Sequence, residues 1–342
     1  MRAGRSQNWD LGIERQLRGG IIVKADYVAN NIKHLPVTGG GDLNQIPDQY
    51  LSLGTLLNAD IYSPAAVAAG IKIPYTGFKG SVGQALRPYP QYTMINCTMC
   101  PMGYNYYHSL QLNAQKHFSQ QGLTFLVAYT IAKTITNVAG FGGQGIGNES
   151  CQDWYNRKTC RFQEYNTRPQ VLSLSYVYDL PFGPGRRWGQ TTDRVTRNVI
   201  GGWRVSGIHQ YFSGPPIQIL FFNRVPGVPI TGNATCGTYN PSDPAHNKYL
   251  NAAAFTVPPA FTYGNTYQLP VRMCGYANEN VSLQKLFHPS ERTTLEFSAD
   301  AANLLNRHAW TGVATNPTVA SYGTITGASS PRAFQFHAKV LF

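Results

Sequence analysis

The chain ends in Phe334-Gln-Phe-His-Ala-Lys-Val-Leu-Phe342, where apolar and polar residues alternate with Leu341 as the single exception. Side chains point to opposite faces along a β-strand, so this period predicts a strand with one apolar and one polar face. An apolar face on the edge strand of a soluble sheet invites aggregation, whereas in a membrane barrel it contacts lipid. The terminal strand therefore favours a β-barrel that spans a membrane.

The same two-residue period recurs upstream. Together with the terminal strand we expect about nine strands, most of them long enough to cross a bilayer at the tilt of a barrel. The regular segments are 9–17, 21–27, 104–118, 123–131, 172–180 and 295–301, and less regular alternation marks 198–222 and 279–288.

Short and long connections alternate between these segments. Three are tight turns, near 18–20, 119–122 and 288–291, and 181–197 is of moderate length. Short periplasmic turns and long extracellular loops alternate in this way in outer-membrane barrels, and a soluble β-sandwich has no reason to do so. We therefore predict an all-β fold, an antiparallel transmembrane β-barrel segment. The long connections, rich in Gly, Pro, Asn and Thr, are 31–103, 137–165, 223–275 and 306–331.

The composition agrees with this class. Charged residues make up 13% of the chain, about half the usual share, while Tyr (21) and Phe (16) are abundant. No apolar run reaches the roughly 18 residues of a transmembrane helix. The net charge of +12 is scattered, with one small group at Arg186, Arg187, Arg194 and Arg197, so it does not indicate nucleic-acid binding. Contact with anionic lipid headgroups is a weaker hypothesis that fits a barrel.

The amino terminus lacks the apolar segment of a secretory signal. In addition, the first and last predicted strands run in the same direction, and an antiparallel barrel closes with an even number of strands. We therefore expect that further strands precede residue 1, and that 1–342 is the carboxyl-terminal portion of one barrel domain.

Six cysteines fall in the first three long loops, two in each. This distribution predicts one disulfide per loop, formed in the oxidising periplasm. Cys151–Cys160 and Cys236–Cys274 are the firmer pairs, because a bond between Cys97 and Cys100 would close a strained ring. The C-x-x-C spacing of Cys97 and Cys100 leaves metal or redox chemistry as the alternative.

Catalytic patterns are missing from the sequence. It has no H-E-x-x-H motif and no serine at a strand-to-helix elbow. Glu296 and Asp300 share the polar face of one predicted strand, which the hydrated lumen of a barrel explains without catalysis. We expect no enzymatic activity, no cofactor and no metal site.

Several stretches resemble, in order along nearly the whole chain, the barrel of TonB-dependent outer-membrane receptors, in particular the Oar-like group. The most extended are Leu172-Ser-Leu-Ser-Tyr-Val-Tyr-Asp-Leu-Pro-Phe-Gly183, Gly201-Gly-Trp-Arg-Val-Ser-Gly207 and Ala302-Asn-Leu-Leu-Asn-Arg-His308. The others are 8–17 with 27–35, 109–112, 126–134 and 322–332.

The resemblance implies a 22-stranded barrel closed by an amino-terminal plug, which the TonB complex moves to admit a scarce solute. Neither a plug nor a TonB box lies within these residues, so contact with TonB would run through an amino-terminal part. The implied location is the bacterial outer membrane, with lipid and lipopolysaccharide around the barrel. A passive porin or surface adhesin is the first alternative, and a soluble secreted β-protein the second.

The resemblance also assigns a role to the terminal strand, as the signal that the barrel assembly machinery reads. The residues of that signal are Phe334, Phe336, Ala338, Val340 and Phe342. No segment of the long loops has a recognisable ligand geometry, so the substrate-binding residues and the transported solute stay unknown.

Overall fold

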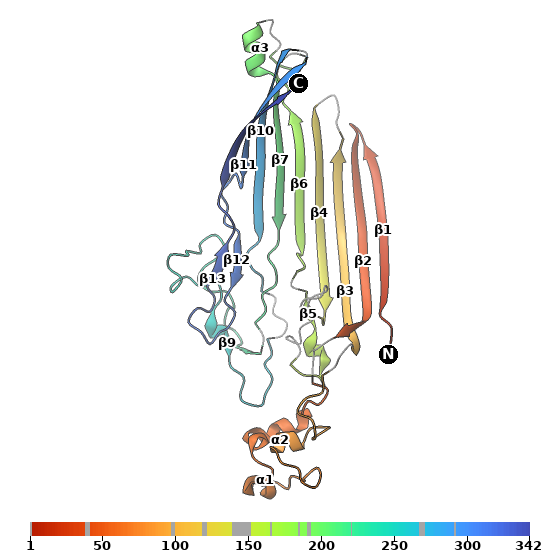
Figure 1. The fold of residues 1–342 in the computed structure, drawn as a ribbon, viewed down its shortest axis with the longest axis vertical. Coiled ribbons are helices and arrows are strands. Elements are labelled where there is room, and N and C mark those ends of the chain that lie inside the picture. The colour runs from red at the N-terminus through yellow and green to blue at the C-terminus, as the bar shows by residue number, and fades with distance from the viewer. Residues whose placement is uncertain are drawn as a thin grey trace.

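A computed structural model shows one large antiparallel sheet, in which the long strands follow each other in chain order (Figure 1). A short additional strand, β5 (Phe162–Gln163), pairs with β4 only. The structure describes residues 2–37, 42–96, 100–117, 122–138, 152–164, 166–183, 185–189, 193–219, 221–266, 271–290 and 292–342.

The long strands number nine in the described chain, which confirms the number expected from alternation. Each pairs antiparallel with the strand before it along the sheet. The strands are β1 (Arg5–Leu17), β2 (Ile21–Val37), β3 (Cys100–Lys116), β4 (Leu123–Thr136), β6 (Gln170–Asp179), β7 (Trp203–Phe212), β10 (Tyr276–Ser290), β11 (Thr293–Ala302) and β14 (Ala333–Leu341).

Two boundaries differ from expectation. β2 continues past the predicted loop start at 31 and pairs with β3 as far as Val37 and Cys100, with register shifts after Lys33. The region 198–222, predicted as one strand, contains only β7, because helix α3 (Arg194–Ile200) precedes it. Irregular alternation hid both features.

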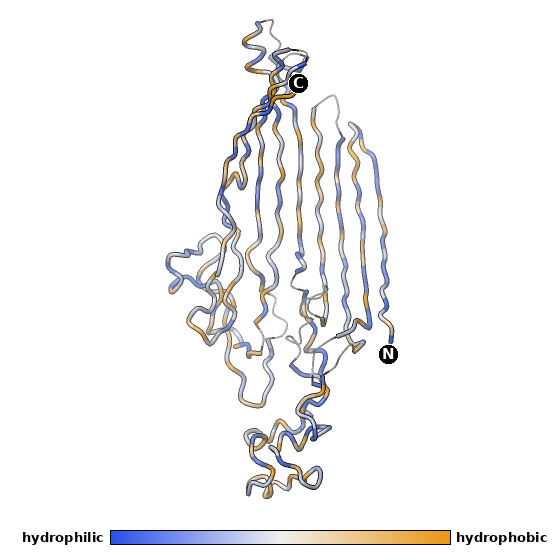
Figure 2. The backbone as a smooth tube through the Cα atoms, in the orientation of Figure 1, coloured by the Kyte–Doolittle hydropathy of each residue, from blue (hydrophilic) through white to orange (hydrophobic). Residues whose placement is uncertain are grey.

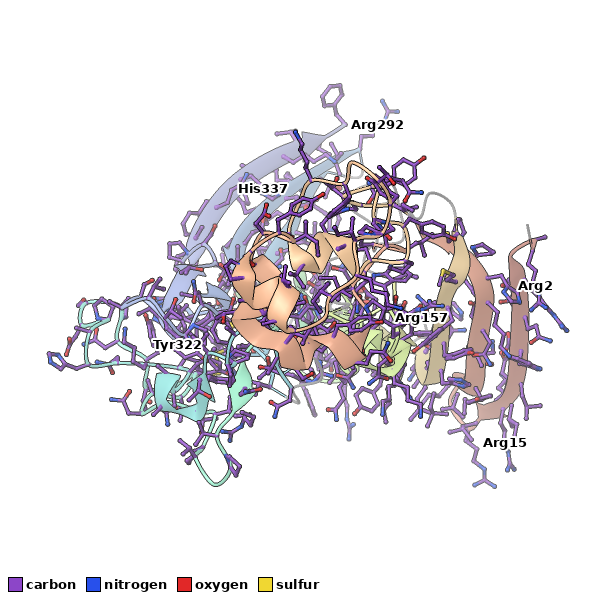
Figure 3. The ribbon with its side chains drawn as sticks, turned by 90° about the horizontal axis from the view of Figure 1, so that it is seen from below. Arg2, Arg15, Arg157, Arg292, Tyr322 and His337 are labelled. Atoms are coloured by element: carbon purple, nitrogen blue, oxygen red, sulfur yellow. A yellow bond between two sulfur atoms is a disulfide. The ribbon has the colours of Figure 1, made fainter. Side chains whose placement is uncertain are left out.

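The register aligns side chains of like polarity across neighbouring strands. Leu11 lies opposite Tyr27, Tyr27 opposite Leu110, and Leu110 opposite Ile131. Apolar and polar residues therefore alternate along each strand, as Figure 2 shows for much of the sheet. Seen along the strands, the sheet bends into an open arc, with His337 on its concave side and Arg15 on its convex side (Figure 3). The polar rows line the concave face, and the apolar rows cover the convex face.

The arc is not closed. β1 and β14 form its two edges and do not pair with each other. Because nine antiparallel strands place the first and the last in the same direction, an antiparallel ladder between them is impossible.

The long connections gather at one end of the strands, the loop end, and the shorter ones at the other, the turn end (Figure 1). Between β2 and β3 lies a small body with its own apolar core, made from 3₁₀ helix η1 (Asp48–Asn58), α1 (Pro64–Ala68) and α2 (Val82–Ala85). Ser63 and Ser81 cap the two α-helices by accepting hydrogen bonds from Ala66 N and Gln84 N. The core residues are Leu57, Ile61, Ala66, Phe78, Val82 and Ala85. We call this the first loop body.

A second loop body combines residues from two connections that are far apart in the sequence. Its core holds Ile219, Leu250 and Tyr322, each about 2% exposed or less. The described elements here are β8 (Asn223–Arg224), η4 (Ala252–Ala254), β9 (Phe255–Thr256), β12 (Trp310–Val313) and β13 (Ile325–Ala328), and a further 3₁₀ turn, η3 (Arg157–Cys160), lies before β5.

No helix in the described part of the chain is both long and apolar enough to cross a membrane.

Candidate functional site

The concave face of the sheet carries hydroxyl, amide and charged side chains. It is hollowed by a cavity of about 720 Å³, whose lining includes Leu126, Ser175, Ile208, Ser282 and Asp300. These residues come from five different strands, so the hollow follows from the register of the sheet rather than from any local motif. The lining combines hydroxyl and carboxylate groups with apolar side chains such as Leu126 and Ile208.

One of the acidic residues that alternation placed on this wall contacts a histidine of the neighbouring strand. Asp300 Oδ2 lies 3.2 Å from Nδ1 of His337, and Ser298 Oγ lies 2.9 Å from the same nitrogen. The carboxylate and imidazole are each more than a third exposed. The pair therefore ties β11 to the edge strand β14 across the lumenal face.

At the loop end, one side chain joins three connections. The Gln45 amide donates to Asp153 Oδ1 (3.0 Å) and to the Tyr263 hydroxyl (2.8 Å), and its Oε1 accepts from the backbone N–H of Trp154 (2.9 Å). The Tyr155 hydroxyl donates to the Gln45 carbonyl (2.9 Å). Both polar atoms of the Gln45 side chain thus form hydrogen bonds with residues of other connections.

Carboxylates and phenols beside Gln45 also take part in this contact. The Tyr263 hydroxyl donates to Asp48 Oδ1 at 3.2 Å. Burial, together with the nearby negative charge of Asp153, raises the pKa of Asp48 above its ordinary value. Burial and the charge of Asp48 likewise raise the pKa of Tyr155 and of Tyr263, so both phenols stay protonated donors at neutral pH. We call Gln45, Asp48, Asp153, Tyr155 and Tyr263 the loop junction.

The first loop body presents exposed tyrosine rings on a rigid backbone. Asn44 is fully buried, and its amide donates to the carbonyls of Tyr89 (2.9 Å) and Tyr92 (2.7 Å) while accepting from Tyr89 N. Gln84 donates to Pro90 O and again to Tyr92 O. The two rings are 52% and 55% exposed. A fixed backbone with open aromatic rings suits contact with a ligand at low entropic cost.

Three arginines lie near the loop end of the strands. Arg157, which Figure 3 shows near the middle of the end-on view, donates to Met102 O (2.7 Å) and lies over the Trp154 ring. Burial, with repulsion from Arg168, lowers the pKa of Arg272. Arg168 itself lies 5.5 Å from the centre of the Phe212 ring.

The predicted assembly residues all lie on or directly after β14, at the free edge of the sheet. Phe334, Phe336 and Val340 are 57%, 76% and 56% exposed, and Phe342 is fully exposed. The pairing with β11 puts Phe336 opposite Ala299 and Ala338 opposite Phe297 on the convex face. The strand is as expected, while its role in assembly stays a prediction.

Cys236 and Cys274, one of the expected pairs, are joined by a disulfide with a Cα–Cα distance of 5.6 Å. Cys100 and Cys160 are also disulfide-bonded. Their expected partners, Cys97 and Cys151, lie outside the described residues, so both of those pairings stay predictions.

The loop junction and the arginine group were not anticipated. Their members come from separate connections, and no spacing along the chain links them; Gln45 and Tyr263 are 218 residues apart. Only loop packing brings them together.

Comparison with known proteins supports the fold. A family model described as an outer membrane beta barrel domain matches residues 1–335. Among curated proteins none matches the sequence. The ferric-catecholate import receptor Fiu from K12 E. coli shares 11% identity at a TM-score of 0.39, over 99% of this chain and 27% of that chain.

Two further solved structures are similar to the same degree. The outer membrane transporter YddB from Escherichia coli shares 12% identity at a TM-score of 0.45, over 99% of this chain and 33% of its own. FpvA of P. aeruginosa, solved with bound pyoverdines, shares 10% identity at a TM-score of 0.39, over 98% of this chain and 27% of its own. The chain thus spans a third or less of the length of these receptors. Given the match over residues 1–335, the chain belongs to the outer-membrane β-barrel domain family, and its place is the bacterial outer membrane.

Proposed function

We propose that this chain is the barrel portion of a TonB-dependent transporter that takes up a scarce solute across the outer membrane. The observation that carries the proposal is the loop junction, where Gln45 links three extracellular connections through both polar atoms of its amide. A passive porin keeps an aqueous channel open. Loops bonded to each other at the extracellular end suit capture of a solute before passage.

The open sheet supports the proposal that this chain is part of a larger barrel. β1 and β14 run in the same direction and leave both edges unpaired, although edges are costly in a membrane. Further strands of the same protein would close the barrel, and the sequence resemblance to TonB-dependent receptors supplies the plug within it.

The charge at the extracellular end indicates the class of solute. Arg168 lies over the ring of Phe212 on the lumenal face, and the first loop body adds the exposed rings of Tyr89 and Tyr92. Guanidinium groups bind anionic oxygens, and aromatic rings stack on planar groups. We infer that the solute is anionic and bulky.

Uptake by a strain that lacks the full-length gene tests the proposal. The strain, complemented with wild type or with Arg168→Gln, is tested for growth on iron chelates, cobalamin, oligosaccharides and peptides. Each test is repeated in a background without TonB. We expect that one anionic solute requires both the gene and TonB, and that Arg168→Gln weakens its uptake. Uptake that persists without TonB would identify a passive porin instead, and normal growth with impaired surface attachment would indicate an adhesin.

A further inference from the structure

The connection between β6 and β7 differs from the other described turns at the periplasmic end. It contains helix α3, which projects beyond the sheet near the carboxyl end of the chain (Figure 1). Periplasmic turns in barrels are ordinarily short. A helix at this end therefore needs an explanation that the strand pattern does not provide.

Two side chains of the apolar face hold the carboxyl end of α3. Trp203 Nε1 donates to the Val199 carbonyl at 2.9 Å, and Lys285 Nζ donates to the same carbonyl at 3.1 Å and also to Gly201 O. Trp203 and Lys285 lie opposite each other in the register of β7 and β10. The helix is therefore held at the convex, lipid-facing rim of the barrel rather than over its lumen.

The rest of the connection is closely packed. Gly183 has a φ of 101°, and a Cβ added there would lie 2.5 Å from the Cα of Gly201. The rings of Phe182 and Trp188 lie 5.8 Å apart, and their backbones form a bridge. The helix and the aromatic pair thus have fixed positions on one rim.

Despite this close packing, several large apolar side chains of the connection are exposed. Val195 and Val199, one turn apart on α3, are 71% and 60% exposed, and Trp188 and Phe182 are 50% and 42% exposed. The Arg187 guanidinium lies 5.1 Å from the centre of the Trp188 ring. We call Phe182, Trp188, Val195, Val199 and Arg187 the rim anchor.

The surroundings are rich in arginine. Arg186 bonds to Asp179, whose other oxygen accepts from Arg204. The carboxylate of Asp193 accepts a hydrogen bond from Thr196 N in the first turn of the helix. Cations therefore outnumber carboxylates around the exposed apolar side chains.

We propose that the rim anchor inserts into the inner leaflet of the outer membrane and that Arg187 binds anionic phospholipid headgroups. Aliphatic and aromatic side chains beside arginine are typical of segments that lie in a membrane interface. The rim anchor is continuous with the lipid-facing surface through Trp203 and Lys285, and its charge is opposite to that of an anionic leaflet. The inference rests on the outer-membrane location and not on the proposed transport.

Depth-dependent quenching tests the insertion. The full-length protein carries a thiol-reactive fluorophore at Val195→Cys or Val199→Cys and is reconstituted in vesicles that contain spin-labelled lipid. Val67→Cys is the matched control, because Val67 is also on a short helix and is 67% exposed, but on the extracellular side. Leu283→Cys on the lipid-facing row of β10 is the positive control. Heat-modifiable migration confirms that each variant is folded.

We expect several-fold stronger quenching at Val195 and Val199 than at Val67. The difference should increase when phosphatidylglycerol is added to phosphatidylcholine vesicles, and Arg187→Gln should reduce that increase. Quenching at both helix positions that is no stronger than at Val67 would show that the helix does not insert into the membrane. A periplasmic protein would then be the partner that covers the rim anchor. Equal quenching in the two kinds of vesicle would overturn the assignment to anionic headgroups.

Discussion

The disulfide between Cys236 and Cys274 allows a quantitative prediction. It closes a loop with a sequence separation of 38 residues around the core of the second loop body. We consider the double variant Cys236→Ser, Cys274→Ser, which avoids leaving a single free thiol. The strand ladders do not depend on this bond, so the effect should be confined to the second loop body.

The magnitude follows from the length of the closed loop. The chain-entropy relation, applied to this separation, gives a loss of about 4 kcal/mol at 25 °C. Because every 1.4 kcal/mol is a tenfold change, local opening should become several-hundred-fold more frequent. The Trp310 indole, which donates to the Cys236 carbonyl at 2.9 Å, should lose protection together with the core.

Hydrogen exchange with mass spectrometry, in detergent, measures this opening peptide by peptide. Peptides that contain Leu250 and Tyr322 should exchange several-hundred-fold faster in the variant. Peptides that contain Phe78 serve as an internal control, because the first loop body has a separate core. Unchanged exchange at Leu250 would refute the reasoning, and equal acceleration at Phe78 would show that the effect is not local.

Three further predictions concern single sites. Phe78→Ala should destabilise the first loop body by about 3–5 kcal/mol, because the ring is 2% exposed, and limited proteolysis of intact cells should then cleave between residues 48 and 86 without loss of the barrel. Asp48→Asn should stabilise the loop junction at neutral pH. A raised pKa means that the folded state prefers the protonated carboxyl, so stability is present in acid and is lost as the pH rises through that pKa. In hydrogen-exchange measurements across pH, the extra stability of the Asp48→Asn loop junction should vanish in acid. Extra stability that does not change with pH would show that the raised pKa of Asp48 is not its cause. Deletion of Phe342 should lower the amount of protein in the outer membrane, as measured by surface labelling, and unchanged levels would argue against its role in assembly.

The period-two pattern made the strands predictable because it depends on residues that are close in sequence. The apolar face of β1 can be predicted from Trp9, Leu11 and Ile13 alone, without knowledge of the partner strand. The same local rule failed where structure was irregular. Alternation breaks at His34, which has a φ of 58°, and the helix α3 was too short to show a helical period.

By itself the sequence determined the fold class, the number of long strands, the polarity of the two faces and the pairing of Cys236 with Cys274. The tertiary structure alone decided that the connections after β2, β7 and β11 form bodies with apolar cores, that Gln45 joins Asp153 and Tyr263, and that α3 is held against the lipid-facing rim. The physical reason is distance along the chain. A strand shows its faces through neighbours two residues away, whereas a loop contact depends on packing between segments that share no local pattern.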